Sequence, residues 1–189
     1  MAAADETRSE TGPYLLCYDG SPDAAYAIEA AGKLTGGGEA LVLNAWSPPS
    51  GFFLEGRFID DETSPLAPAA EEFDSAAAEE AERIVQEGAE LARGAGFDVT
   101  PLAERAKGAM WHTIVRIAHE RNVRAVVVGS QEMTAFQRAV LGSSALAIVS
   151  HCDRPVIVIP FPPEAADADR SSAVGRIVDR FRRRSSGGD

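Results

Sequence analysis

The chain has 189 residues, of which 45% are hydrophobic, and its 18 basic and 29 acidic residues give a net charge of −11. The hydrophobic share supports one packed core and excludes a wholly disordered chain. The negative charge argues against a general nucleic-acid-binding protein, because such proteins neutralise phosphates with a basic surface.

The first twelve residues are rich in Ala, Glu, Ser and Thr, and we expect a disordered leader over 1–12. They lack the basic and apolar regions of a secretory signal, and no apolar run of the chain is long enough to span a bilayer. These features predict a cytoplasmic location without stable membrane association. We therefore expect Cys17 and Cys152 to be reduced thiols.

The first elements begin and end at clear local signals. The apolar run 14–18 predicts a strand, and Ser21 followed by Pro22 is typical of a helix start. Gly36 is typical of the residue that ends a helix, because glycine accepts the left-handed conformation. The run 40–46, ALVLNAW, is apolar almost throughout, which predicts a strand covered on both faces.

A long proline-containing segment, 47–72, comes between the second strand and the predicted second helix, 73–93. Its length is unusual for a loop in a compact domain. Its phenylalanines, Phe52, Phe53 and Phe58, either cover the core or dimer of the protein itself or form a contact surface for a partner.

The remaining elements alternate in the same way. They are a strand at 97–103, a helix at 110–120, a strand at 123–128, a helix ending at 151 and a strand at 155–159. Pro101 indicates that the third strand lies at an edge, because proline cannot donate to a ladder. The pattern predicts an α/β domain over 13–160, with a five-stranded doubly wound parallel sheet in the order 3-2-1-4-5 and helices on both faces.

A tail is expected over 161–189, with a linker followed by a short helix at 172–184, SAVGRIVDRFRRR. Apolar residues fall on one side of that helix, namely Val174, Ile177, Val178 and Phe181. The cluster Arg182–Arg184 could contact anionic lipid or RNA. A solvated tail, or a tail docked on the acidic body, is the favoured interpretation.

The order of the strands predicts a ligand site between the first and fourth strands, where the strand order reverses. Asp19 follows the first strand and can accept hydrogen bonds from a ribose or an adenine amino group. Gly129 ends the fourth strand and permits close approach of the backbone. Gly142, Ser143 and Ser144 offer N–H groups and hydroxyls to phosphate at a helix start.

Motifs of the common enzyme classes are absent from the sequence. There is no GxxxxGK[ST], GxGxxG, GxSxG or HExxH motif. His112 and His119 are interpreted as surface or packed residues and not as metal ligands. We therefore predict no catalytic residues and no metal site, and we expect a protein that is not an enzyme, with weak ATP hydrolysis left open.

Several separated stretches together resemble the universal stress protein family. That family carries G-x2-G-x9-G-[ST] after its fourth strand, and Gly129, Gly142 and Ser143 have this spacing here. The other stretches are Tyr18-Asp19-Gly20-Ser21, Val126 to Ser130, and Arg154 to Ile159. The resemblance covers Pro13 to Pro160.

The resemblance implies a stress-response or signalling module that binds an adenine nucleotide, ATP with Mg²⁺, with little or no turnover. Asp19 would meet the adenosine, Ala45 would line the base pocket, and Val128 and Gly129 would lie near the ribose. The phosphates would be held by Gly142, Ser143 and Ser144.

Glu132 departs from the family pattern, because it stands where the family has its second glycine. A carboxylate 4 Å from a phosphate charge repels it by about 4 kcal/mol at an effective dielectric near 20, before screening. Glu132 is tolerated if it faces solvent or holds a divalent ion that bridges to phosphate. The alternative is a nucleotide-free dimeric protein-interaction module.

The resemblance also implies a homodimer through antiparallel pairing of the fifth strand. This strand is β-branched and has an otherwise unpaired edge, which fits such pairing. Its pairing residues would be Val156, Ile157, Val158 and Ile159.

Overall fold

The computed structural model describes residues 12–48, 67–130 and 143–162. Five strands form one parallel sheet in the order β3-β2-β1-β4-β5, which confirms the predicted fold class. The strands are β1 (Tyr14–Cys17), β2 (Gly38–Trp46), β3 (Phe97–Arg105), β4 (Ala125–Gly129) and β5 (Val156–Ile159). The helices are α2 (Pro22–Thr35), α4 (Ala67–Gly94), α5 (Met110–Glu120) and α6 (Ser143–His151).

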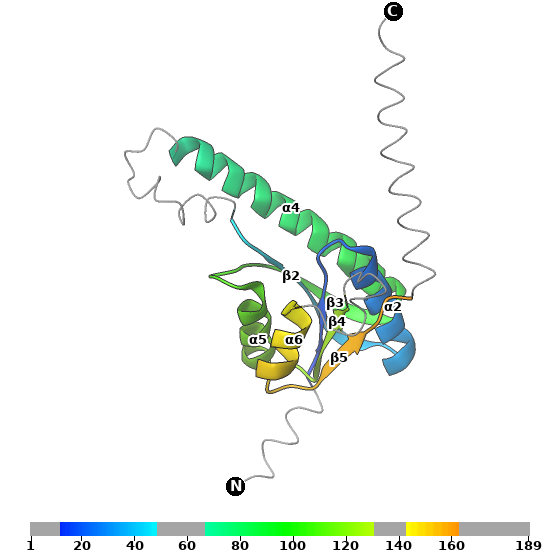
Figure 1. The fold of residues 1–189 in the computed structure, drawn as a ribbon. Helices are drawn as coiled ribbons and strands as arrows, with labels where there is room; N and C mark the ends of the chain where they lie inside the picture. The colour runs from blue at the N-terminus through cyan, green and yellow to red at the C-terminus, as the bar shows by residue number, and fades with distance from the viewer. Residues whose placement is uncertain (1–11, 49–66, 131–142, 163–189) are drawn as a thin grey trace, which may run out of the picture.

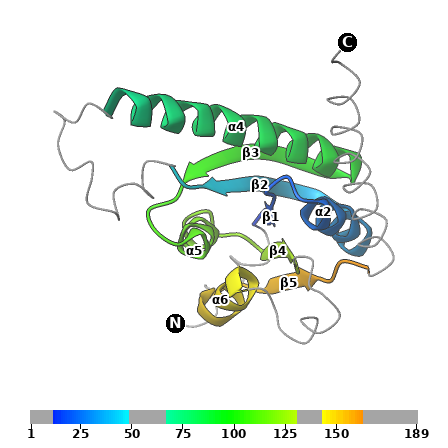
Figure 2. The ribbon, with the colours of Figure 1, turned by 45° about the horizontal axis from the view of Figure 1, so that its top comes forward.

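The helices cover both faces of the sheet, with α2 and α4 on one face and α5 and α6 on the other (Figures 1 and 2). The central strands β1 and β4 alternate their side chains between the two resulting cores. Leu16 and Val127 pack under α2 and α4, whereas Leu15 and Val126 pack under α5 and α6. All four side chains are buried, as expected for parallel strands covered on both faces.

The local signals at the ends of α2 act as predicted. The Oγ of Ser21 accepts a hydrogen bond from the N–H of Ala24 at 3.3 Å, and Pro22 occupies the first turn. Gly36 has φ of 75° and donates its N–H to the carbonyl of Gly32. These contacts pair backbone groups that a helix end otherwise leaves unsatisfied.

The predicted start of the second helix is wrong, because α4 begins at Ala67 and not at Phe73. Pro68 lies in the first turn of α4, where its missing N–H would have no partner within the helix anyway. The predicted segment 47–72 is therefore partly helical. Phe52, Phe53 and Phe58 lie outside the described residues, as do residues 1–11 of the expected leader and residues 163–189 of the tail.

β2 and β3 extend beyond the rest of the sheet. β1 pairs with β2 only from Ala40 to Leu43, but the β2–β3 ladder continues to Trp46 and Arg105. The 28 residues of α4 span about 42 Å at 1.5 Å per residue, and this helix runs past the end of the sheet (Figure 2). Arg105 lies over the Trp46 ring at 5.9 Å and contacts Asp74 of α4 at 3.4 Å. The extension therefore forms one side of the region where the strands end.

Within the described ranges, no helix is long and apolar enough to cross a membrane.

Gly88 permits the contact between α4 and Tyr18, which follows β1. A Cβ at Gly88 would overlap Cδ1 of Tyr18 and would lie 3.0 Å from Cγ1 of Val42. We predict that Gly88→Ala lowers the free energy of unfolding by about 1–3 kcal/mol through overpacking. Urea unfolding followed by circular dichroism measures this difference.

Gly94→Ala is the matched control, because a Cβ at Gly94 on the same helix would meet no atom within 4 Å. It should be neutral or stabilise the protein by up to about 1 kcal/mol. Equal effects of the two substitutions would contradict the packing explanation.

Candidate functional site

A pocket of about 170 Å³ lies at the carboxyl ends of the strands, at the point between β1 and β4 where the strand order reverses. Residues following β1 and at the start of α2 form one part of it, and β2, α5, β4 and α6 complete it. Its lining residues are Cys17, Tyr18, Asp19, Ser21, Asp23, Ala24, Leu43, Ala45, Met110, Ile114, Val128, Gly129, Ser130, Ser144, Ala145 and Ile148.

The structure brings five of the eight predicted site residues to this pocket. They are Asp19, Ala45, Val128, Gly129 and Ser144. Ser143 begins α6, but its side chain lies outside the described residues. Glu132 and Gly142 also lie outside the described residues, so their places relative to the pocket stay predictions.

Ser21 links two carboxylates at the mouth of the pocket. Its Oγ contacts Oδ1 of Asp19 and lies 2.7 Å from Oδ1 of Asp23. Its backbone N–H also donates to Oδ1 of Asp19 at 3.0 Å. A serine hydroxyl carries one hydrogen, so Ser21 donates it to one carboxylate at a time. This edge of the pocket is therefore rich in acceptors and negatively charged.

Gly129 has a structural role that its predicted function does not include. A Cβ at this position would lie 2.5 Å from Oδ2 of Asp23 and 3.0 Å from its carbonyl oxygen. The missing side chain thus allows the first turn of α2 to approach the end of β4. Asp23 is buried there, with 6% of its surface exposed.

The opposite part of the pocket is apolar, with side chains from β1, β2, α5 and α6. Burial, with a smaller contribution from Asp19, raises the pKa of the Cys17 thiol to about 12. Cys17 is therefore a protonated, weakly polar lining group at neutral pH and not a thiolate nucleophile. It is a free cysteine, as is Cys152.

Tyr18 fixes the backbone from which Asp19 projects. Its N–H donates to the carbonyl of Leu43 at 2.9 Å, and its carbonyl accepts from Nδ2 of the buried Asn44 at 2.8 Å. Its hydroxyl donates to Oε1 of Glu87 at 2.7 Å. Burial and this hydrogen bond raise the pKa of Tyr18.

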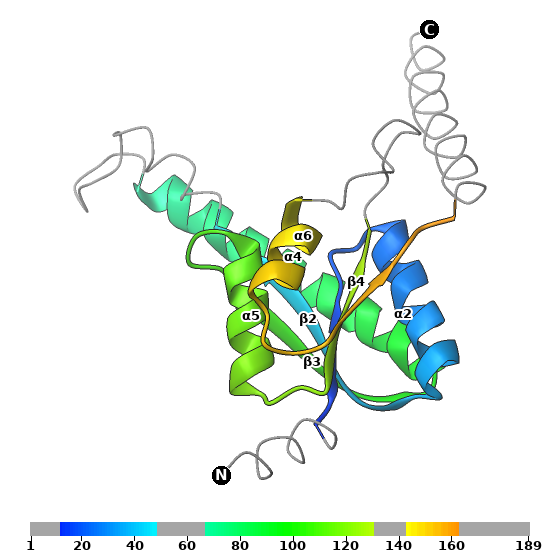
Figure 3. The ribbon, with the colours of Figure 1, turned by 60° about the horizontal axis from the view of Figure 1, so that its bottom comes forward.

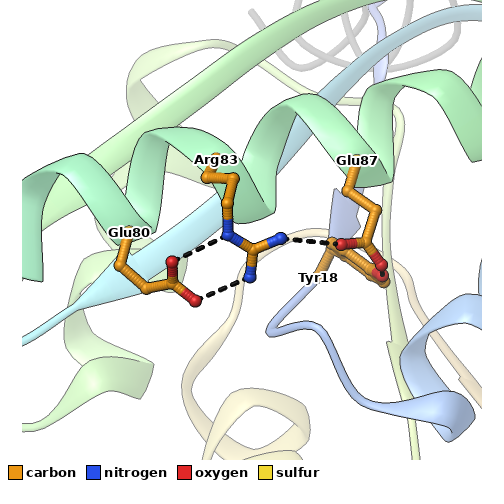
Figure 4. A network of polar contacts seen from close by, with 4 residues as sticks. All are labelled: Tyr18, Glu80, Arg83 and Glu87. Atoms are coloured by element: carbon orange, nitrogen blue, oxygen red, sulfur yellow. Dashed lines mark hydrogen bonds and ion pairs between the residues drawn. The ribbon is translucent and has the colours of Figure 1, made fainter.

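Figure 4 shows how α4 holds the acceptor of the Tyr18 hydroxyl. Arg83 lies between Glu80 and Glu87, at 2.6 Å and 3.3 Å from their carboxylate oxygens. Both ion pairs are exposed, so each contributes little to stability by itself. Glu87 thus contacts Arg83 through one carboxylate oxygen and the Tyr18 hydroxyl through the other.

Several pocket residues were missed by sequence reasoning. Ser21 is predicted as a helix cap and as part of a family-like stretch but not as a site residue, and Asp23 resembles the acidic residues common in a first helical turn. No local signal of the sequence places Ile114 or Met110 at this pocket. Their position depends on how α5 packs beside β2, which the sequence pattern does not specify.

The family model that describes the universal stress protein family matches residues 12–160. The chain belongs to this family. No match is found among curated proteins.

Solved structures of the family share the fold of this chain. A universal stress protein from Lactobacillus plantarum, UspA, is 20% identical, with a TM-score of 0.57 over 79% of this chain and 98% of the other. A universal stress protein from Archaeoglobus fulgidus in complex with dAMP is 20% identical, with a TM-score of 0.53 over 79% and 98%. A universal stress protein in complex with cAMP is 17% identical, with a TM-score of 0.52 over 80% and 98%.

The histidines and acidic residues of the described ranges bear on whether the chain has a metal site. Among the described residues, no group of three or more His, Cys, Asp or Glu is arranged to hold a metal ion. His112 and His119 are both exposed. Nδ1 of His119 lies 2.9 Å from Oδ2 of Asp153, and this hydrogen bond lowers the pKa of Asp153.

Ser21 allows a direct test of how the pocket edge is held. Ser21→Ala removes the helix cap and the hydroxyl that contacts both Asp19 and Asp23, so we expect the free energy of unfolding to fall by about 1 kcal/mol. Urea unfolding measures this change, and Ser21→Thr, which keeps a hydroxyl, is the matched control. If Ser21→Ala were as stable as the unchanged chain, repulsion between the crowded oxygens would outweigh the cap.

Proposed function

We propose that this family member acts in the cytoplasm as a stress-response or signalling module that binds an adenine nucleotide in the pocket between β1 and β4. The observation that carries the proposal is the pairing, in one pocket, of an apolar part with an acceptor-rich edge. A nucleoside has two parts that complement these, because its flat base can pack on an apolar surface and its sugar carries hydroxyl donors.

The apolar part suits the base. Ala45 has a small side chain that leaves space between β2 and α5, and Leu43 and Ile114 provide aliphatic surface. The described pocket, at about 170 Å³, is smaller than the roughly 300–1,000 Å³ of pockets for drug-sized ligands. We therefore assign the base to the described pocket and the phosphates to the region near the start of α6.

The acidic edge suits the sugar. Asp19 and Asp23 are acceptors, which match the hydroxyls of ribose or the amino group of adenine. The solved family structures with cAMP and dAMP, both adenine nucleotides, support this choice of ligand class. Because these family structures hold adenine nucleotides, we infer that the base bound by this chain is adenine.

The same edge disfavours a chain of phosphates. No lysine or arginine is present among the described residues that line the pocket, whereas two carboxylates are. The start of α6 supplies N–H groups and a positive helix end for one phosphate. A triphosphate needs Mg²⁺ to offset its repulsion from Asp19, Asp23 and, in the family position, Glu132. We infer that AMP binds without Mg²⁺ and that ATP requires it.

We propose little or no turnover of the bound nucleotide. Hydrolysis of a phosphate needs an activated water or nucleophile beside it. Cys17 is kept protonated by burial, and the carboxylates of Asp19 and Asp23 beside Ser21 repel an anionic phosphate from its hydroxyl. Neither group is prepared to attack phosphorus.

Isothermal titration of the full chain with AMP, ATP and Mg²⁺·ATP tests the ligand. We expect AMP to release heat without Mg²⁺, and ATP to do so only with Mg²⁺. Ala45→Leu should abolish all of this heat by filling the base pocket. Ala103→Leu is the control, because Ala103 is half-buried on the neighbouring strand β3 but packs on the other face of the sheet.

Two results would contradict the proposal. Absence of heat with all three ligands would favour the nucleotide-free interaction module. Equal binding by Ala45→Leu and the unchanged chain would place any nucleotide elsewhere.

We also propose that the protein is a homodimer through β5. β5 pairs with β4 on one side and with no strand of the described sheet on the other. The carbonyls of Pro155 and Ile159 accept hydrogen bonds from Val126 and Ser130, so alternate residues of β5 face β4. The N–H and C=O groups of Val156 and Val158 therefore face the free edge, where a second β5 can pair.

Val158→Pro tests this edge. It removes one N–H from the free edge without removing a bond to β4, so we expect a folded monomer. Light scattering of the full chain measures the mass. Val158→Ala, which keeps the N–H, should remain dimeric, and a dimer that survives Val158→Pro would place the interface elsewhere.

A further inference from the structure

A second and larger hollow lies on the face of the sheet covered by α2 and α4. These two helices lie side by side there (Figures 1 and 3), and the groove between them has a volume of about 650 Å³. We call it the α2–α4 groove. Its lining residues are Glu29, Gly32, Lys33, Glu87, Glu90, Leu91, Gly94 and Ala95.

The floor of the α2–α4 groove is small and apolar. Gly32 of α2 has no room for a side chain, because a Cβ there would overlap the carbonyl oxygen of Ala95. Gly94 and Ala95 add little bulk, and Leu91 is half-buried. A surface made of such residues admits the close approach of another helix.

The edges of the α2–α4 groove carry three carboxylates and one amine. Glu87 is engaged with Tyr18 and Arg83, but Glu29 and Glu90 make no hydrogen bond or ion pair with any residue that the structure describes. Both are exposed. The groove is therefore negatively charged and has two carboxylates available to a basic ligand.

The last described residues of the chain contact α2, the helix that forms one side of this groove. After β5, Phe161 packs on Tyr26 of α2, with ring centroids 5.6 Å apart and ring planes at 87°. The N–H of Phe161 donates to Oγ of Ser130 at 3.3 Å. Tyr26 does not line the groove, but it precedes the lining residue Glu29 by one helical turn, so the tail beyond Phe161 departs from the helix that forms one side of the groove.

We propose that the α2–α4 groove binds the C-terminal segment of the same chain, residues 172–184. This segment contains five arginines and one aspartate, and its apolar residues fall on one side of a helix. The apolar side fits the floor at Leu91 and Ala95. The arginines fit Glu29 and Glu90, because guanidinium groups form bidentate contacts with carboxylates.

The length of the connection favours docking within one chain. Nine residues, 163–171, separate the described end of the chain from this segment, and nine residues can span about 30 Å. Along α2, Tyr26 and Lys33 are about 10 Å apart at 1.5 Å per residue. A tether of this reach holds the segment at a high effective concentration near its own groove, which a second copy of the chain cannot match in dilute solution.

Hydrogen–deuterium exchange of the full chain, read by mass spectrometry, tests the proposal. We expect amides of 172–184 to exchange about tenfold or more slowly than an unprotected peptide, because docking stabilises their helix. Glu29→Lys with Glu90→Lys should abolish this protection. Glu79→Lys with Glu82→Lys is the matched control, with the same change of charge on α4 outside the groove, and should keep it.

Two further measurements test the electrostatic part of the proposal, namely exchange at high salt and exchange in a variant whose groove is more negative. In 1 M salt, where the screening length falls to about 3 Å, the protection should weaken. Lys33→Glu adds a carboxylate to the groove and should preserve protection to higher salt. Unchanged exchange in the strands would show that each variant is folded.

Four results would overturn the proposal. The first is unprotected exchange of 172–184 in the unchanged chain. The second is protection that survives Glu29→Lys with Glu90→Lys. Protection lost on dilution would assign the groove to a second copy, and protection seen only with phosphatidylserine vesicles would assign the segment to anionic membranes.

Discussion

The hydrogen bonds of Tyr18 are the constraint on which the arrangement of this domain depends. Tyr18 lies one residue beyond β1. Its backbone N–H and C=O form hydrogen bonds with Leu43 and Asn44 of β2, and its hydroxyl donates to Glu87 of α4. Buried polar groups are costly when unpaired, so these three contacts favour one position for the end of β1. That position determines where Asp19 lies and where Ser21 begins α2. The acceptor-rich edge of the pocket therefore depends on a tyrosine whose side chain points to the opposite core, against Gly88.

The approach of α2 to β4 adds a second constraint, which joins packing to binding. Asp23 reaches the end of β4 only because Gly129 has no side chain. Whether Gly129 also lies near a ribose stays a prediction, but the described contact shows that this glycine admits Asp23. Two consequences follow. Glycine at position 129 of this chain has a packing reason independent of any nucleotide, and the carboxylate that Gly129 admits makes the pocket more negative.

Most of the fold and part of the site could be predicted from the sequence. Most of the features that could not be predicted depend on packing between distant parts of the chain. Local conformational preferences mark the start of α2 at Ser21-Pro22, its end at Gly36 and the strand at Val126–Val128. These elements could therefore be recognised without a structure. Asp19 and Gly129 could be placed together because parallel strands end at one edge of a sheet. The start of α4 could not be predicted, because Pro68 is compatible with both a loop and a first helical turn. The contact of Asp23 with Gly129, the contribution of α5 and the α2–α4 groove all depend on non-local packing that has no local signal.

α2 connects the two hollows of the domain. Its first turn contributes Ser21 and Asp23 to the pocket, and its last turns contribute Glu29 and Lys33 to the α2–α4 groove. Between them, Tyr26 holds Phe161, which follows β5 and also contacts Ser130 at the pocket. Under the two proposals, a ligand that moved Ser130 or the first turn of α2 would act on Phe161, from which the tail departs, and a segment held in the groove would act on α2 in return. Because coupling between two sites is reciprocal, occupation of the pocket and occupation of the groove must affect each other equally if they affect each other at all.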